Sequence, residues 1–142
     1  MAVNYFAILI ASVLQFLVGF VWYTPLFGKL WGKMHGFDLV PKEQQDKMMK
    51  SMGPLLAVQF MSTVVTTVVL ALFIGGLQSL SWNPYGIAFF MWLGFVVPTQ
   101  IAAVIFGGTK PEWVVKKILV MAGASLICLM VAAAVLHYMP AV

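Results

Sequence analysis

Charged residues are scarce in this chain. Only 8% of its 142 residues are charged, whereas 63% are hydrophobic, and the mean hydropathy is +1.01. A soluble domain carries roughly 25% charged residues, so this chain has too little polar surface to stay in water. The composition excludes a soluble globular protein. It predicts a single integral membrane domain over residues 1–142, without a separate soluble domain.

Arginine is absent altogether, and cysteine occurs once, at Cys128. Arginine's planar fork is the usual choice for phosphate and nucleic-acid recognition, so its absence argues against both kinds of partner. The net charge of +4 comes from lysines in the connections between apolar runs, and we interpret it as a topology signal. A single cysteine excludes an intrachain disulfide.

The chain also lacks the residue patterns of catalytic sites. Its four acids lie in or beside the connections, and none lies within an apolar run. There is no Ser/His/Asp order, no Cys-x-x-Cys pair and no phosphate-binding loop. We therefore expect no enzyme, and no metal or cofactor.

What the chain does contain is four apolar runs, each long enough to cross a bilayer. A transmembrane helix needs about 20 apolar residues at a rise of 1.5 Å each. The runs cover residues 3–23, 55–77, 85–106 and 113–138. Glycine and proline occupy the connections between them, as is usual between helices. The predicted fold class is all-α, a polytopic membrane protein with four transmembrane helices.

The lysines predict the orientation of these helices. Five lie in residues 24–54, one in residues 107–112 and two just beyond, whereas both chain ends and residues 78–84 have none. The positive-inside rule then places both termini outside and the connections 24–54 and 107–112 in the cytoplasm. Aromatic residues near the ends of the runs, Trp22 among them, are expected to mark the membrane interfaces.

Within the first connection, residues 41–52 predict a short amphipathic helix. Pro41 suits a first helical position, and Gln45, Met48, Met49 and Met52 share one face. We expect this helix to lie flat on the inner membrane surface or to fold under the bundle.

Polar residues inside the apolar runs form the candidate site. Pro98 lacks an N–H, so the carbonyl of Gly94 loses its usual helical partner, and in lipid such a group must be satisfied by neighbours. At the helical rise, Gln15, Gln59 and Gln100 lie about 10, 7 and 9 Å from the inner ends of their helices, and thus at nearly one depth. The predicted polar layer comprises Gln15, Gln59, Ser62, Thr63, Gly94, Pro98, Thr99 and Gln100.

Small and polar residues also form stripes on the helix faces, as expected at packing surfaces in membranes. The stripe on the third run is Gly94, Pro98 and Ala102. Two interpretations of the layer remain open. Its amides and hydroxyls bond one another across helices, with serine and threonine also bonding their own i−4 carbonyls. Alternatively, they line a cavity for a neutral or weakly polar solute or a cation, as broken helices do in transporters.

The chain resembles a known family at several motifs. They are Trp-Tyr-Thr-Pro at residues 22–25, Lys-Ser-Met-Gly at residues 50–53 and Gly-Phe-Val-Val-Pro-Thr at residues 94–99. Together they are similar to the small bacterial membrane proteins grouped as the domain-of-unknown-function family numbered 1761. The resemblance implies a four-helix protein of mostly prokaryotic origin, hence a multi-pass protein of a bacterial plasma (inner) membrane. It implies no activity.

The leading functional hypothesis is a non-enzymatic bundle that binds or conducts a small solute or lipid at the polar layer near the cytoplasmic side. The alternative is a structural or accessory membrane subunit without transport of its own. Four short helices leave small-residue faces uncovered, so we also expect a homo-oligomer, most simply a dimer.

Overall fold

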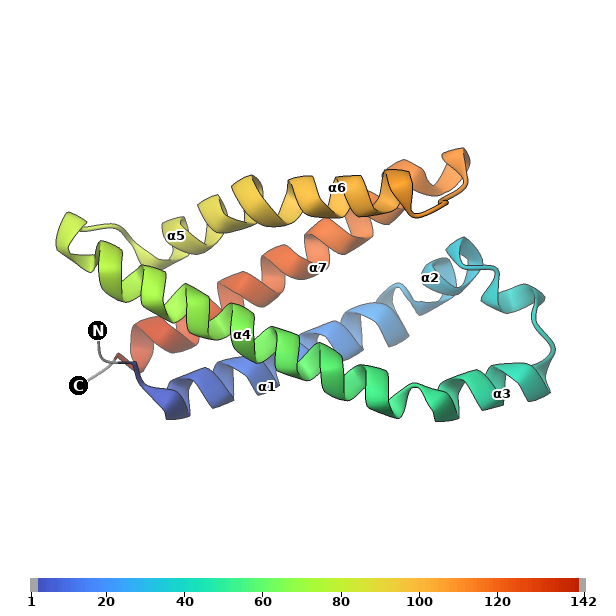
Figure 1. The fold of residues 1–142 in the computed structure, drawn as a ribbon, viewed down its shortest axis with the longest axis horizontal. Helices are drawn as coiled ribbons and strands as arrows, with labels where there is room; N and C mark the ends of the chain where they lie inside the picture. The colour runs from blue at the N-terminus through green and yellow to red at the C-terminus, as the bar shows by residue number, and fades with distance from the viewer. Residues whose placement is uncertain (1–2, 141–142) are drawn as a thin grey trace.

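The computed structural model describes residues 3–140, and these residues form helices and no strand. Four helical segments are long and apolar enough to cross a membrane: Tyr5–Leu26, Gly53–Leu80, Pro84–Phe106 and Pro111–Tyr138. They lie along one another in an elongated bundle (Figure 1). The prediction of an all-α fold with four such helices is confirmed.

Several of these segments consist of shorter elements. The α-helices are α1 (Tyr5–Val21), α2 (Gly28–Met34), α3 (Lys42–Ser51), α4 (Gly53–Leu77), α5 (Pro84–Met91), α6 (Val97–Phe106) and α7 (Pro111–Tyr138). Two π-helical turns, η1 (Trp22–Leu26) and η4 (Trp92–Val96), interrupt the first and third segments. Two short 3₁₀ turns, η2 (Phe37–Leu39) and η3 (Gln78–Leu80), lie in the connections.

Local sequence explains where the helices begin. The Asn4 side chain accepts hydrogen bonds from the N–H groups of Phe6 and Ala7, at 3.1 and 3.0 Å, and so caps α1. Asn83 caps α5 in the same way, and prolines stand at the first positions of α5 and α7. Gly108 precedes α7 with φ +70°, a left-handed conformation that glycine adopts without strain.

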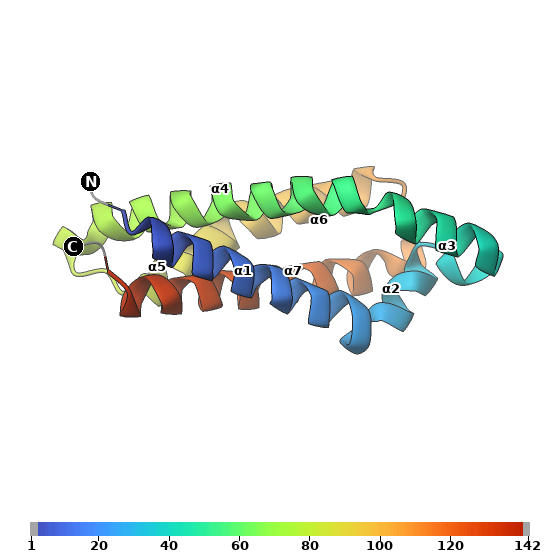
Figure 2. The same cartoon turned by 90° about the horizontal axis from the view of Figure 1, so that it is seen from below.

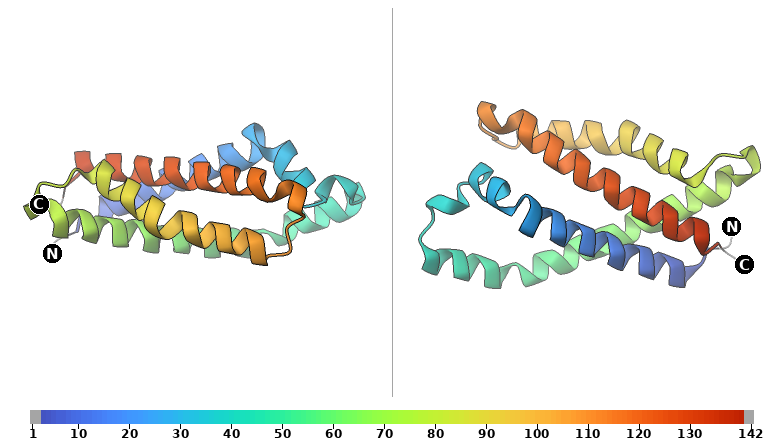
Figure 3. Two further views of the ribbon diagram at one scale, coloured as in Figure 1. Left: turned by 90° about the horizontal axis from the view of Figure 1, so that it is seen from above. Right: turned by 180° about the vertical axis from the view of Figure 1, so that it is seen from behind.

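Helix α7 occupies the middle of the bundle. It lies between α1 on one side and the α5–α6 segment on the other (Figures 1 and 3), while α4 crosses α1 and also contacts α5 and α7. The shared core consists of small and branched apolar residues from four helices. They are Ala7, Ile8, Ala11, Leu70, Ile87, Ala88, Leu129, Ala132, Ala133 and Leu136. Alanines at these positions let the backbones approach closely, as is usual between helices in membranes.

Both chain ends lie at one end of the bundle, and the lysine-bearing segments lie at the other (Figures 1 and 2). The Asn4 amide Nδ2 donates to the carbonyls of Met139 and Pro140 at 3.4 and 3.3 Å, which ties the start of α1 to the end of α7. The four segments run along the bundle in alternating directions, so the chain ends at the end of the bundle where it began.

The first connection contains a helix where one was predicted, α3. Its methionine face is uncovered, because Met48, Met49 and Met52 are 49%, 62% and 40% exposed. The expectation that this helix folds under the bundle is thus wrong for the described residues. Its contact with a membrane surface stays a prediction. Gln45 instead fixes the preceding loop, donating to the carbonyls of Phe37 and Val40 at 3.0 and 2.8 Å.

The two π-helical turns share one construction. Each begins at a tryptophan whose carbonyl accepts an i→i+5 hydrogen bond, from the N–H of Phe27 in η1 and of Val97 in η4. Each indole N–H donates to a backbone carbonyl of α7. Trp22 Nε1 reaches Val120 O at 3.0 Å, and Trp92 Nε1 reaches Ala122 O at 2.8 Å. The two indoles thus hold α7 from both flanking segments.

The small-residue face of the third segment is not buried within one chain, and its packing against a second copy stays a prediction. Gly94, Pro98 and Ala102 are exposed, and the face of Ala88, Trp92, Val96, Gln100 and Val104 points inward instead. From Ala88 to Val104 an unbroken α-helix would rotate by about 4.4 turns, which would carry Val104 away from that face. The π turn holds one residue more than an α-helical turn, so the rotation from Ala88 to Val104 is only about 4.2 turns. The bulge therefore keeps the larger side chains on a single face.

The close contact between Trp22 and Gly123 gives a prediction. A Cβ at Gly123 would lie 2.9 Å from Trp22 Cζ2, and the indole cannot retreat without losing its bond to Val120 O. We expect Gly123→Ala to lower the free energy of unfolding by about 1–3 kcal/mol, the usual range for overpacking. The measurement is unfolding by sodium dodecyl sulfate in mixed micelles, followed by circular dichroism.

The matched control is Gly86→Ala, where a Cβ would meet nothing within 4 Å. That change should be neutral or stabilise by up to about 1 kcal/mol, since alanine is the better helix former. Equal stability of the two variants would contradict a fixed Trp22 indole.

Candidate functional site

One buried polar cluster joins α1 to α4. Gln15 is 5% exposed, and Ser12 and Thr67 are fully buried. Gln15 Nε2 donates to Thr67 Oγ1 at 2.6 Å and to Ala11 O at 3.2 Å, while Ser12 Oγ lies 3.3 Å from Thr67 Oγ1. The Thr67 hydroxyl donates in turn to its own i−4 carbonyl, that of Thr63, at 2.8 Å. We call Ser12, Gln15 and Thr67 the first cluster.

A second cluster joins the third segment to α7. Trp92 Nε1 lies 3.2 Å from Ser125 Oγ, in addition to its bond to Ala122 O. The Ser125 hydroxyl donates to Ala122 O at 3.0 Å and lies 3.5 Å from Gln100 Oε1. We call Trp92, Gln100 and Ser125 the second cluster, and all three residues are half-buried.

Helix α7 connects the two clusters. Cys128 Sγ donates to the Gln15 carbonyl at 3.5 Å, which links α7 to the first cluster. Val120, Ser125 and Cys128 span about 12 Å along the helix at its ordinary rise. Every buried side-chain nitrogen or oxygen among residues 3–140 has a hydrogen-bond partner. The fully buried polar side-chain atoms of the described residues are thus paired within the protein.

The structure does not bring the three predicted glutamines together. Gln59 is exposed, as is Ser62, and Thr63 is half-buried. Gln59 shares an i, i+4, i+8 face with Thr63 and Thr67, but α4 crosses α1 obliquely, so this face leaves the bundle toward its N-terminal end (Figure 1). Thr63 Oγ1 donates to Gln59 O at 3.0 Å, the i−4 bond expected of a helical threonine.

The residues around the predicted break in the third segment also lie on its outer surface. Gly94, Pro98 and Thr99 are exposed. The Thr99 hydroxyl donates to the carbonyls of Phe95 and Val96, so it satisfies backbone groups beside the π turn and does not reach into the bundle. Of the predicted layer, only Gln15 and Gln100 take part in the two clusters.

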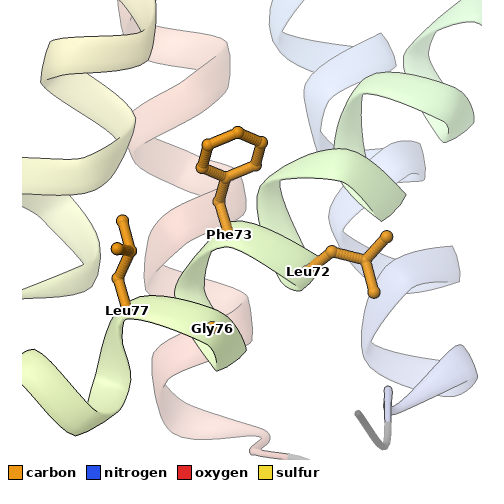
Figure 4. Close-up of a pocket in the computed structure, with 4 residues that line it drawn as sticks. All are labelled: Leu72, Phe73, Gly76 and Leu77. Carbon is orange, nitrogen blue, oxygen red and sulfur yellow. The ribbon is translucent and has the colours of Figure 1, made fainter.

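Two hollows stand out in the described residues, and neither is lined by a residue of either cluster. The first has a volume of about 360 Å³ and is formed by Leu72, Phe73, Gly76 and Leu77 of α4 (Figure 4). It is an open apolar surface on a single helix, without a polar group to orient a ligand. The second, of about 320 Å³, lies at the lysine-bearing end between α2 and the α6–α7 turn.

Metal ligands do not cluster in the described part of the chain. Residues 3–140 contain no group of three or more histidines, cysteines, aspartates or glutamates placed to hold a metal ion. The two clusters offer amide, hydroxyl and indole groups, which suit hydrogen bonding between helices.

Sequence reasoning missed Ser12, Thr67 and Trp92. Trp92 lies eight residues into its apolar segment, too deep for an interface residue, and a buried indole N–H needs an acceptor. Thr67 lies on the face that Gln59 and Thr63 define, one turn further into the span. Trp22 was expected at the interface, but its N–H donates to an α7 carbonyl.

Comparison with known proteins identifies one family. The family model described as "Protein of unknown function (DUF1761)" matches residues 6–137, which is nearly the whole chain. No curated protein and no solved structure matches. The resemblance seen in the sequence motifs is thereby confirmed.

The first cluster predicts measurable coupling between its members. We expect Gln15→Leu and Thr67→Val to be coupled in a double-mutant cycle by about 0.6 kcal/mol, and by at most about 1.7 kcal/mol, as measured for such bonds in membranes. The observable is again unfolding by sodium dodecyl sulfate in micelles.

The control cycle pairs Gln59→Leu with Thr63→Val. Thr63 bonds the backbone carbonyl of residue 59 and not its side chain, so these two changes should add without coupling. Coupling of similar size in both cycles would mean that the 2.6 Å contact of Gln15 contributes nothing specific.

Proposed function

The chain belongs to the DUF1761 family of proteins of unknown function, and from this premise we propose a structural or accessory membrane protein that is not an enzyme. In this proposal the two polar clusters hold the helices together. The observation that carries it is the Gln15 amide, which is 5% exposed and bonded to Thr67 at 2.6 Å. An amide that lined a solute path would keep donors free for the solute, whereas this one donates to Thr67 of α4 and to the Ala11 carbonyl of its own helix.

A second candidate function is the binding or conduction of a small solute or lipid near the cytoplasmic side. It is favoured by η4, because π-helical turns occur frequently at functional sites. Gly94, Pro98, Thr99 and Gln59 are exposed on the described chain, so such a path would have to lie at a seam between protomers. These residues do not face the interior of one bundle.

The proposed location is a bacterial plasma (inner) membrane, crossed four times, with both termini outside and residues 24–54 and 107–112 in the cytoplasm. Support comes from the separation of the two ends of the bundle. The chain ends meet at one end through Asn4, and all eight lysines lie toward the other. The positive-inside rule assigns the lysine-bearing end to the cytoplasm.

We further propose that the protein forms a homodimer through α4. Only 11% of the 18-residue apolar stretch in this helix is buried within one chain. Gln59, Ser62 and Thr66 are exposed along one side of the helix. A glutamine amide facing hydrocarbon is unfavourable without a partner. A second copy offers the same amide across a twofold axis, where each Gln59 can both donate and accept.

Thiol labelling tests the closed interior. In a Cys128→Ala background, Gln15→Cys should remain unreactive toward a water-soluble maleimide in intact membranes, because its position is buried and bonded. A membrane-permeant thiol reagent applied after denaturation provides the control for total cysteine. Labelling of Gln15→Cys from either aqueous side would refute the packing role and favour a water-filled path.

The same assay tests orientation through two loop positions. Ser79→Cys, in η3, should react from outside intact cells, and Gln44→Cys, in α3, only after the cells are permeabilised. The reverse pattern would overturn the proposed topology without bearing on the packing of Gln15.

Disulfide cross-linking tests the dimer. In the Cys128→Ala background, Gln59→Cys and Ser62→Cys should form a disulfide-linked dimer on mild oxidation, since a twofold axis along this side brings like residues together. The matched control is Met61→Cys, which is also exposed but lies about 135° around the helix from the centre of that stripe. If Met61→Cys cross-links as well as Gln59→Cys, contact between the chains is random collision and the α4 seam is wrong.

A further inference from the structure

The second hollow gathers positive charge at the lysine-bearing end of the bundle. Its polar and aromatic lining comes from two parts of the chain that lie close to each other at this end (Figures 1 and 3). These residues are Lys33, His35, Thr109, Lys110, Trp113 and Lys117. We call this hollow the lysine cavity. Its volume of about 320 Å³ is at the lower end of the range of small-molecule sites.

No carboxylate lines the lysine cavity. Asp38 and Glu112 adjoin lining residues in the sequence, but neither lines the cavity. Among residues 3–140 the single ion pair is Lys47 with Glu43, at 3.0 Å within α3. Lys33, Lys110 and Lys117 therefore place three like charges around one cavity without a carboxylate in its lining. Their mutual repulsion falls when an anion enters between them.

Contacts with neighbouring side chains hold part of the cavity in place. Lys117 Nζ donates to Thr109 Oγ1 at 3.3 Å and lies 5.9 Å from the centre of the Trp31 ring. The His35 ring packs on the same Trp31 at 4.4 Å. Gly108, with φ +70°, turns the chain so that Thr109 precedes α7. At least one of the three ammonium groups is thus held in position before any ligand arrives.

We propose that the lysine cavity binds an anionic phosphate group, either the headgroup of an anionic phospholipid or a soluble phosphate. Lysine binds phosphate as a point charge, so the absence of arginine excludes a bidentate fork but not this mode. The Thr109 hydroxyl, which accepts from Lys117, still has its proton and adds a neutral donor. This binding goes beyond the structural role proposed above and does not depend on it.

The positive-inside rule alone would also explain why lysines lie at this end. The lysines of α3 distinguish that explanation from a phosphate site. Lys42 and Lys50 carry the same charge at the same end of the bundle, but they line no part of the cavity. A topology signal depends on the number of lysines. A phosphate site depends on their position.

The test uses the purified full chain in zwitterionic detergent and native mass spectrometry. The probes are dioctanoyl phosphatidylglycerol, dioctanoyl phosphatidylcholine and inorganic phosphate. For the site, Lys33→Gln and Lys117→Gln should each weaken phosphatidylglycerol binding about fivefold, the equivalent of about 1 kcal/mol per lysine. Lys42→Gln and Lys50→Gln should leave it unchanged. Circular dichroism establishes that each variant is folded. Because Lys33 is exposed, Lys33→Gln tests the site even if the half-buried Lys117 is needed for folding.

The outcomes separate the two sources of phosphate. Binding of phosphatidylglycerol but not phosphatidylcholine, lost with Lys33 and Lys117, identifies a lipid headgroup. Binding of inorganic phosphate with the same lysine dependence identifies a soluble ligand. Equal losses from the cavity lysines and the α3 lysines, or binding of none of the probes, would overturn the proposal. Those results would leave the Gln15 labelling test unaffected, because it concerns a different part of the bundle.

Discussion

The fold depends on how α7 receives its hydrogen bonds. In an apolar medium every polar group must find a partner within the protein, and an indole N–H that enters the bundle needs an acceptor. Trp22 and Trp92 find theirs on Val120 and Ala122 of α7, from the two segments that flank it. Directional bonds of this kind fix the rotation and depth of a helix, which non-directional apolar packing alone does not. Gly123 permits the close approach of the Trp22 indole.

The same constraint accounts for the two π turns. A tryptophan can reach α7 only if its helix presents it inward while the rest of the face continues to pack. In the third segment, the extra residue in η4 returns Gln100 and Val104 to the face that Trp92 begins. Pro98 directly follows this turn, at one of the first two positions of α6. A proline is tolerated there because the helical hydrogen bond that its missing N–H would donate is already interrupted by the turn. The irregular backbone and the indole bond are therefore parts of one arrangement.

The span positions were predictable because hydropathy reports a solvent property that each residue carries independently. The polar contacts were not, since they depend on the rotation of each helix. Gln15 lies inside the bundle, where its amide donates to Thr67 of α4. Gln59 occupies a similar depth, but the oblique crossing of α4 over α1 leaves it outside. A depth estimate locates a residue only along the helix axis. A contact such as that of Gln15 with Thr67 also depends on the angle at which the two helices cross and on which side of each helix faces the other.

The two ends of the bundle differ in whether their polar and charged groups have partners within the protein. At the terminal end, Asn4 caps α1 and bonds the end of α7, and the core packs alanines against leucines and isoleucines. At the other end, Lys33, Lys110 and Lys117 surround a hollow without a carboxylate. Burial and hydrogen bonding stabilise the first end without any ligand. At the second, an anion would offset the repulsion among the lysines, as the proposed phosphate site requires.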